Sequence, residues 1–198
     1  MRVVSLSGSA RTDVGKKDAK RLRNAGMIPC VVYGGENQLI FSVPITEFKE
    51  LIFNPNVAFV DLNIDGKLIK AILQDVQYHP VSDAIYHVDF KELQEDKPII
   101  MGIPVKVIGK SVGVTKGGKS QIKMRKLKVK ALPANMPETI TLDITSLEIG
   151  NSIRVKEIQI ENVELLDVPN TVAVTINVTR AAAAAALAAA APAPKGKK

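Results

Sequence analysis

Five basic side chains lie within residues 16–23, at spacings that would gather them on one side of a helix. The segment Lys16–Ala25 is predicted to form a short helix that ends at Gly26, because glycine readily takes the left-handed conformation that follows a helix. Leu22 falls on the opposite arc and would anchor the helix. Lysine and arginine in this arrangement can neutralise phosphates. The basic residues of the arc are Lys16, Lys17, Lys20, Arg21 and Arg23.

The first turn of the predicted helix carries Lys16 and Lys17, where cations are unfavourable. The helix dipole is positive there, so each cation costs about 0.3–1 kcal/mol. Nearby phosphates would reverse the sign of that cost, and Gly15 would let the backbone approach them. Asp18 falls within the apolar arc, so the amphipathic pattern is imperfect. The competing interpretation is a solvated charged face.

His87 and Asp89 are two residues apart and share one face of a predicted strand. Such a pair can belong to a catalytic site; alternatively, Asp89 orients His87 or accepts a hydrogen bond from a sugar or base edge. The chain has two histidines in all and no nucleophile motif near this pair. We therefore expect no enzymatic activity.

No cofactor or metal is expected. Cys30, His79 and His87 lack a recognised ligand spacing, and Gly113–Gly118 lacks the Gly-Lys-Ser/Thr ending of a phosphate-binding loop. Cys30 lies in an apolar run and is expected in the core. As the single cysteine it excludes an internal disulfide, which fits a reducing compartment.

The net charge of +7 suits a polyanionic partner, but the charge is unevenly distributed. Residues 1–95 carry 11 basic and 12 acidic side chains, whereas residues 96–180 carry 13 and 8. An RNA site in the first half must therefore be a local patch. No secretory or membrane-spanning segment is recognised, since the alanine run 181–191 is too short and too weakly hydrophobic. The expected location is the cytoplasm.

A second basic stretch, Lys110–Lys130, carries eight basic residues and no acidic one. The apolar alternation changes phase near Arg125-Lys126, which predicts a β-bulge within one strand. We hypothesise that its cationic face contacts rRNA, an interpretation favoured over a solvated strand whose lysines protect an exposed edge. The candidate residues are Lys123, Arg125, Lys126, Lys128 and Lys130.

Residues 1–93 are predicted to form a six-stranded β-barrel with two short helices, the second at Ile45–Ile52. Apolar residues recur mostly at every second position, and Asp65-Gly66 between two such runs is a strong hairpin signal. The predicted strands are Arg2–Arg11, Ile28–Tyr33, Gln38–Val43, Val57–Ile64, Lys67–Val76 and Ala84–Phe90.

The polar segment Lys91–Lys97 predicts a domain boundary before a second, all-β domain at 98–180. The chain is thus expected to be mainly β with short helices (α+β). The alanine-rich, lysine-tipped tail 181–198 is of low complexity and is predicted to be disordered. The predicted strands of the second domain are Ile99–Ile108, Ile122–Ala131, Thr139–Asp143, Ser152–Lys156 and Thr171–Thr179.

Several motifs, in this order along residues 2–180, resemble one known family. It is the bacterial large-subunit ribosomal protein number twenty-five, in the two-domain form also called general stress protein CTC type. The motifs are Arg11, Gly15-Lys16, Lys20-Arg21-Leu22-Arg23, Ile28-Pro29, Tyr33-Gly34-Gly35, Gln74-Asp75-Val76-Gln77, His79-Pro80, His87-Val88-Asp89-Phe90, Gly113-Val114, Gly117-Gly118, Ala131-Leu132-Pro133-Ala134-Asn135 and Leu147-Glu148-Ile149-Gly150.

The resemblance implies a structural constituent of the large ribosomal subunit that supports translation. Its barrel would bind 5S rRNA in the minor groove of the loop E region, as a monomer within the particle. Large-subunit rRNA and neighbouring ribosomal proteins are further candidate partners. The alternative is a free RNA-binding stress factor that associates only transiently with the ribosome. The RNA contacts that the resemblance implies are Arg11, Lys16, Lys20, Arg21, Arg23, Tyr33, Gln74, His87 and Asp89.

The chain departs from the family's usual Gly-Lys-Gly-Ala-Ser-Arg-Arg-Leu-Arg at three positions that bear on these contacts. Lys17 replaces a glycine, Ala19 a serine and Lys20 an arginine. The serine's hydrogen bond to RNA is then missing, and lysine cannot reproduce the bidentate hydrogen bonding of arginine.

Overall fold

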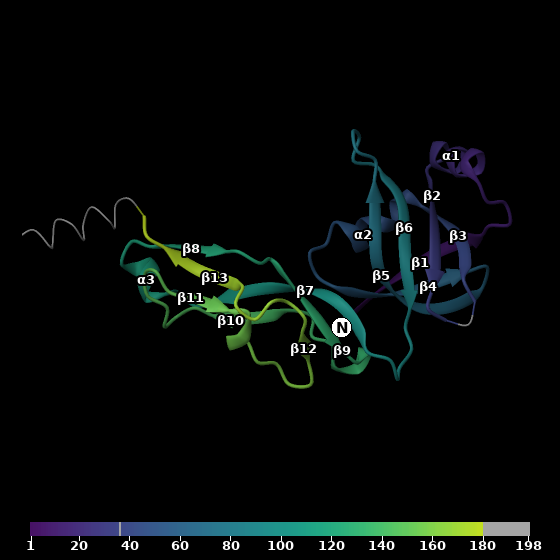
Figure 1. The fold of residues 1–198 in the computed structure, drawn as a ribbon. Helices are drawn as coiled ribbons and strands as arrows, with labels where there is room; N and C mark the ends of the chain where they lie inside the picture. The colour runs from purple at the N-terminus through teal and green to yellow at the C-terminus, as the bar shows by residue number, and fades with distance from the viewer. Residues whose placement is uncertain (36, 180–198) are drawn as a thin grey trace, which may run out of the picture. The chain divides into compact units, whose positions relative to one another are not determined.

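The N-terminal part of the chain is a closed six-stranded barrel. A computed structural model describes residues 1–35 and 37–179, so the predicted tail at 181–198 lies outside the described residues. Around the barrel the strands follow the order β1-β3-β2-β6-β5-β4 (Figure 1). The predicted barrel is therefore confirmed. Its strands are β1 (Arg2–Ala10), β2 (Met27–Tyr33), β3 (Leu39–Pro44), β4 (Ala58–Ile64), β5 (Lys67–Tyr78) and β6 (Ile85–Glu92).

The hairpin between β4 and β5 forms at the predicted turn. Asp65 and Gly66 have φ values of 49° and 89°, the two positive values that a type I′ turn requires. The strands then pair antiparallel, from Ile64 with Lys67 to Phe59 with Ile72. This local signal sets the register of β4 and β5.

Phe41 and Phe90 lie at the centre of the barrel core. Both are fully buried, and their ring centroids are 5.9 Å apart. Cys30 is also fully buried, and burial raises the pKa of its thiol well above the usual range. Its placement in the core agrees with the sequence prediction.

Two helical segments accompany the barrel. Helix α1 (Lys16–Asn24) follows β1, and Gly26 after it has φ 76°, the left-handed conformation predicted for this glycine. The predicted helix Ile45–Ile52 is a 3-10 turn, Ile45–Phe48, that continues as the single α-helical turn α2 (Lys49–Ile52). Phe48 and Leu51 from this segment are buried in the barrel core.

The C-terminal part contains two further sheets, so the second β region is also confirmed. One has the order β10-β7-β9-β12 and the other the order β11-β13-β8. The elements are β7 (Ile99–Ile108), α3 (Val112–Thr115), β8 (Lys119–Ile122), β9 (Lys126–Ala131), β10 (Ile140–Asp143), β11 (Ser152–Arg154), β12 (Glu164–Leu165) and β13 (Val172–Asn177), with 3-10 turns at Pro133–Asn135 and Val155–Glu157.

The predicted single strand Ile122–Ala131 with a β-bulge is wrong. The chain leaves β8 after Ile122 and enters β9 at Lys126, and these strands belong to different sheets. Val105 N donates to Arg125 O, and Lys123 N donates to Ala173 O, so the segment between them passes from one sheet to the other. The change of phase in the sequence marks this change of sheet.

Contacts within the chain divide it into two compact units. The first comprises residues 1–104, 128–139 and 162–164; the second comprises 105–127, 140–161 and the described residues from Leu165 onward. The domain ranges 1–93 and 98–180, expected from the sequence, remain a prediction.

Candidate nucleic-acid interface

Helix α1 lies against β2 by its less polar side and presents lysines on the other. Ala19 and Leu22 are half-buried, whereas Lys16, Lys17 and Lys20 are exposed. No side chain caps the N-terminus at Gly15. An open depression of about 550 Å³ adjoins this first turn and is lined by Asp13, Val14, Gly15, Lys16, Lys17, Asp18 and Arg21.

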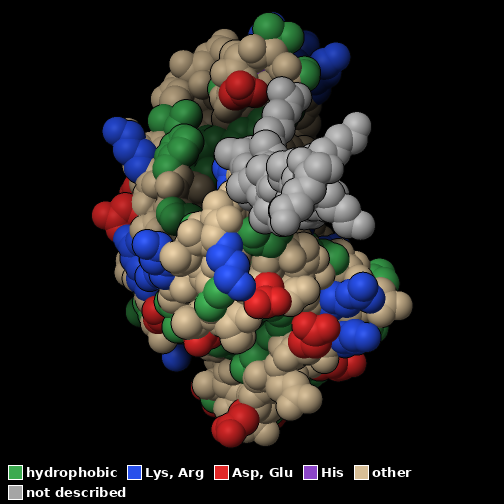
Figure 2. All heavy atoms as spheres, turned by 90° about the vertical axis from the view of Figure 1, so that its left-hand side faces the viewer, with side chains coloured by type: hydrophobic (Ala, Val, Ile, Leu, Met, Phe, Trp, Pro, Cys, Tyr) green, Lys and Arg blue, Asp and Glu red, His purple; other side chains and the backbone are tan. Residues whose placement is uncertain are grey.

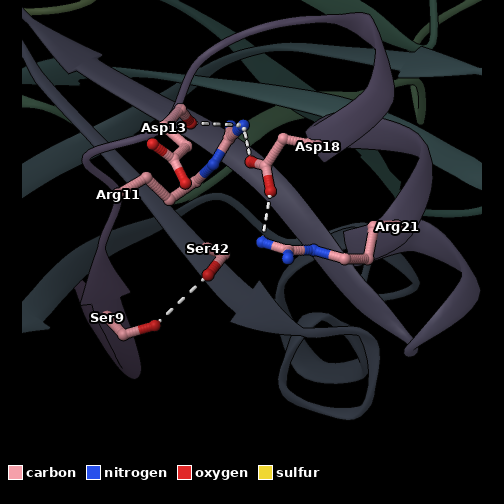
Figure 3. Close-up of polar contacts among 6 residues, drawn as sticks. All are labelled: Ser9, Arg11, Asp13, Asp18, Arg21 and Ser42. Atoms are coloured by element: carbon pink, nitrogen blue, oxygen red, sulfur yellow. Dashed lines mark hydrogen bonds and ion pairs between the residues drawn. The ribbon is translucent and has the colours of Figure 1, made fainter.

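Asp18 lies between two arginines. Its Oδ2 accepts a hydrogen bond from Arg11 Nη2 at 2.7 Å, and its Oδ1 accepts one from Arg21 Nη2, also at 2.7 Å (Figure 3). The Arg11 and Asp18 side chains are only 10% and 15% exposed, whereas that of Arg21 is 75% exposed. The acid that disturbed the amphipathic pattern is thus the one that ties α1 to the residue following β1.

Arg23 attaches the other end of α1 to β6. Its Nε donates to the backbone oxygen of Tyr86 at 2.9 Å, and its guanidinium carbon lies 3.3 Å from the centroid of the Tyr86 ring. A cation over an aromatic face is a favourable contact. Arg11 and Arg23, both predicted RNA contacts, therefore also hold the helix in place.

The other predicted contacts come from neighbouring strands of one barrel wall. Strand β6 pairs with β2 on one side and β5 on the other. Tyr33 lies on β2, His87 and Asp89 on β6, and Gln74 on β5. Val32 of β2 and Val88 and Phe90 of β6 are buried in the interior, so the alternate residues of β2 and β6 face outward.

One row of paired residues leads from the helix anchor to this wall. Arg11 N donates to Ile40 O on β3 at 2.9 Å. Ile40 pairs with Val31, Val31 with Asp89, and Asp89 with Asp75. The basic helix and the polar wall therefore belong to one continuous outer surface of the barrel.

Two irregularities in strand pairing add outward side chains to the wall. Between β5 and β6 the register shifts from Leu73–Phe90 to Asp75–Asp89, which leaves Gln74 as the extra residue. A second shift leaves Tyr86 as the extra residue of β6. Bulges of this kind redirect side chains and are frequent beside functional sites. Neither Asp75 nor Tyr86 was among the contacts predicted from the sequence. Tyr86 is the extra residue of a register shift, which no local pattern marks.

The polar groups of the wall lie close together. His87 Nδ1 is buried and lies 2.7 Å from Asp89 Oδ1, although the alignment is not that of a hydrogen bond. Burial, with Asp89 and Asp75 nearby, raises the pKa of Tyr33 above its usual value. The Tyr33 hydroxyl thus keeps its proton at neutral pH and can donate a hydrogen bond.

The second basic stretch is divided between sheets. Lys123 and Arg125 are exposed on the connection that joins β8 to β9, and Lys126 and Lys128 are exposed on β9. Lys130 Nζ lies 3.0 Å from Glu164 Oε2. On the face drawn in Figure 2, Lys and Arg side chains are interspersed with Asp and Glu side chains. The five candidates therefore do not form one strand face, which corrects the expectation from the sequence.

Within the described residues, no group of three or more His, Cys, Asp and Glu side chains is placed to hold a metal ion. The same part of the chain contains no helix that is both long and apolar enough to span a membrane.

Comparison with known proteins agrees with this architecture. Residues 6–90 match the model of the Ribosomal L25p family, and residues 98–180 match that of the ribosomal protein TL5 C-terminal domain. Proteins called large ribosomal subunit protein bL25 are similar along nearly their whole length. That of Phocaeicola vulgatus is 45% identical, over 91% of this chain and 95% of its own. That of Amoebophilus asiaticus is 41% identical, over 91% and 92%.

The chain belongs to the Ribosomal L25p family and carries the TL5-type C-terminal domain. The resemblance found in the sequence is confirmed. The family is one of ribosomal proteins and is not enzymatic.

The pH dependence of stability should reveal the ion pairs of Asp18. The hydrogen bond from Arg11 lowers the pKa of this carboxyl, with a further contribution from Arg21 and partial opposition from burial. Because the folded pKa lies below the unfolded value of about 3.9, the stabilisation is complete above that value and is lost as pH falls through the folded pKa. At pH 7 we expect wild type to have a higher melting temperature than Asp18→Asn. At strongly acidic pH the two melting temperatures should become equal. A difference that persists unchanged there would contradict the assignment.

Proposed function

We propose that this protein is a structural constituent of the large ribosomal subunit that binds 5S rRNA in the minor groove of the loop E region. The RNA-binding surface comprises α1 and the outer wall of β2, β6 and β5. The continuous row from Arg11 through Ile40 and Val31 to Asp89 carries this proposal, because it joins a cationic helix to a polar wall. The relatives are called large ribosomal subunit protein, and this name supports the proposal that the present protein belongs to the same subunit. A cytoplasmic location follows from it.

The two parts of this surface suit different parts of an RNA helix. Lys16, Lys20 and Arg21 are exposed cations and suit phosphates. The wall carries Asp75 and Asp89, which repel phosphates but accept hydrogen bonds from 2′-hydroxyls and base amino groups. An A-form minor groove is wide and shallow and displays those groups. The helix thus positions the protein on the backbone while the wall contacts sugars and base edges.

Tyr33, His87, Asp89 and Gln74 are the direct contacts of the wall in this proposal. Tyr33 supplies a neutral hydroxyl donor. His87 Nδ1 lies 2.7 Å from Asp89 Oδ1, and both side chains are half-buried in the same wall. Arg11 and Arg23 contribute mainly through the contacts that fix α1, since Arg11 is mostly buried and Arg23 is stacked on Tyr86.

The second basic stretch gives a weaker, additional contact with rRNA in this proposal. Lys126 and Lys128 alternate on β9 with the buried Leu127 and Val129, so they share one outward face. Lys130 continues that face but is paired with Glu164. The candidates on β9 are Lys126, Lys128 and Lys130, with Lys123 and Arg125 on the preceding connection.

Neutralising two exposed cations of α1 should weaken binding in a salt-dependent manner. For Lys20→Gln with Arg21→Gln we expect lower affinity for 5S rRNA, with a salt slope smaller by about 0.7–0.9 for each phosphate that is no longer neutralised. Filter binding at several salt concentrations measures both quantities. Lys49→Gln with Lys97→Gln removes the same charge from exposed positions outside the proposed surface and should change neither. Equal effects of the two double variants would overturn the role of α1.

Removing one hydroxyl from the wall should weaken binding without changing the salt slope. Tyr33→Phe removes a donor and no charge, so we expect a loss of about two- to tenfold in affinity for 5S rRNA. Thr141→Val removes an exposed hydroxyl from β10, outside the proposed surface, and is the control that should bind as wild type. Chemical footprinting of the complex should show protection of the loop E minor groove. Tyr33→Phe binding as tightly as wild type would argue against this wall as the contact.

The contact from β9 predicts an effect on larger rRNA complexes. Lys126→Gln with Lys128→Gln should reduce the salt slope for retention on large subunits by about 0.7–0.9 for each phosphate that these lysines neutralise. Lys97→Gln with Lys156→Gln, two exposed lysines outside the stretch, is the matched control. An unchanged slope in the first variant would leave these lysines as solvated charges that protect a strand.

A further inference from the structure

A carboxylate at the centre of a basic segment requires a physical reason. Residues 2–23 carry seven basic side chains, and Asp18 lies among those proposed to contact phosphates. By charge alone, an acid at this position lowers the positive potential and opposes RNA binding. The structure shows what the carboxylate does there, because both of its oxygens are used within the protein.

The two arginines that bind Asp18 differ in whether their remaining N–H donors are accessible to a partner. Arg11 is largely buried, and its Nη2 also lies 3.3 Å from the backbone oxygen of Asp13, so it ties the loop before α1 to the end of β1. Arg21 is three-quarters exposed and gives Asp18 a bond from Nη2. A guanidinium has five N–H donors in a fixed plane. Arg21 is drawn with one bond, to Asp18 (Figure 3), and is 75% exposed, so it retains further donors for a partner.

We propose that Asp18 is a positioning residue for RNA binding, which bridges the buried Arg11 and the exposed Arg21 and thereby holds the cationic face of α1 in one orientation. This inference rests on the proposed function. Asp18 itself makes no contact with RNA. It acts by fixing Arg21 and the first turn of α1 before RNA arrives, so less side-chain freedom is lost on binding.

The proposal and the charge of Asp18 alone predict opposite changes in RNA affinity when the carboxylate is removed. If Asp18 contributed only its negative charge, Asp18→Asn would bind 5S rRNA more tightly. If it positions the cationic face, the same variant binds more weakly, by about three- to tenfold, because the side chains it held must be ordered on binding. The direction of the change therefore decides between the two.

Asp13 offers a matched control. It is an exposed acid in the same loop and lines the same depression, so Asp13→Asn removes an equal charge without touching the bridge. We expect Asp13→Asn to bind 5S rRNA as tightly as wild type or more tightly. Affinities of the full chain are measured at a temperature well below the melting point of each variant, so that a loss of global stability does not enter.

A double-mutant cycle tests whether Asp18 acts through Arg11. Asp18→Asn and Arg11→Gln remove the same bridge. The double variant should therefore bind 5S rRNA as tightly as the single variant that binds less tightly of the two. Additive losses, or an Asp18→Asn variant that binds as tightly as wild type, would overturn the positioning role. If Asp18→Asn is unfolded at the assay temperature, Asp18→Glu replaces it; this variant keeps the charge but displaces the carboxylate from the two arginines, so it should bind more weakly than wild type, and equal binding would overturn the positioning role.

A measurement on the RNA-free protein separates this inference from the proposed function. Relaxation of the Arg21 Nε–Hε group by nitrogen-15 NMR should show an ordered side chain in wild type and in Asp13→Asn, and a mobile one in Asp18→Asn. A wild type that does not bind 5S rRNA refutes the proposed function alone. An Arg21 side chain that is equally mobile in all three proteins refutes the bridge.

Discussion

Strand β1 closes the barrel because it changes partner along its length. Arg2–Gly8 pair in parallel with β4, and Ser9 and Ala10 pair antiparallel with β3. Gly8 lies at the change, where an added Cβ would be 2.9 Å from the backbone oxygen of Ser42, so the absence of a side chain allows the approach. Closure leaves the barrel without an open edge. It also fixes where the chain leaves β1, and therefore where Arg11 meets α1.

The interface depends on this closure because its two parts are distant in sequence. Residues 11–23 supply the helix and its anchor, whereas Gln74, His87 and Asp89 lie more than fifty residues later. They become neighbours through β3, β2 and β6, whose hydrogen-bonded register is continuous. The barrel half carries slightly more acid than base, so its capacity to bind RNA depends on this local arrangement and not on net charge.

Internal pairing also decides how each charged residue can act. Asp18 holds Arg11, Arg23 stacks on Tyr86, and Lys130 pairs with Glu164. These contacts divide a set of basic residues that look alike in the sequence into those that fix the structure and those that remain exposed to a partner. Opposite charges within a basic surface can thus organise its cations as well as reduce its potential.

The sequence alone determined the strands of the barrel, the turn at Asp65-Gly66, the helix that ends before Gly26, and the family. These depend on local signals: alternation of apolar residues, glycine conformations and motif order. The tertiary structure decided the partners of Asp18, the extra residues Gln74 and Tyr86, and the separation of β8 from β9 into two sheets. Each of these depends on strand register or on contacts between distant segments, which the pattern of a single segment does not encode.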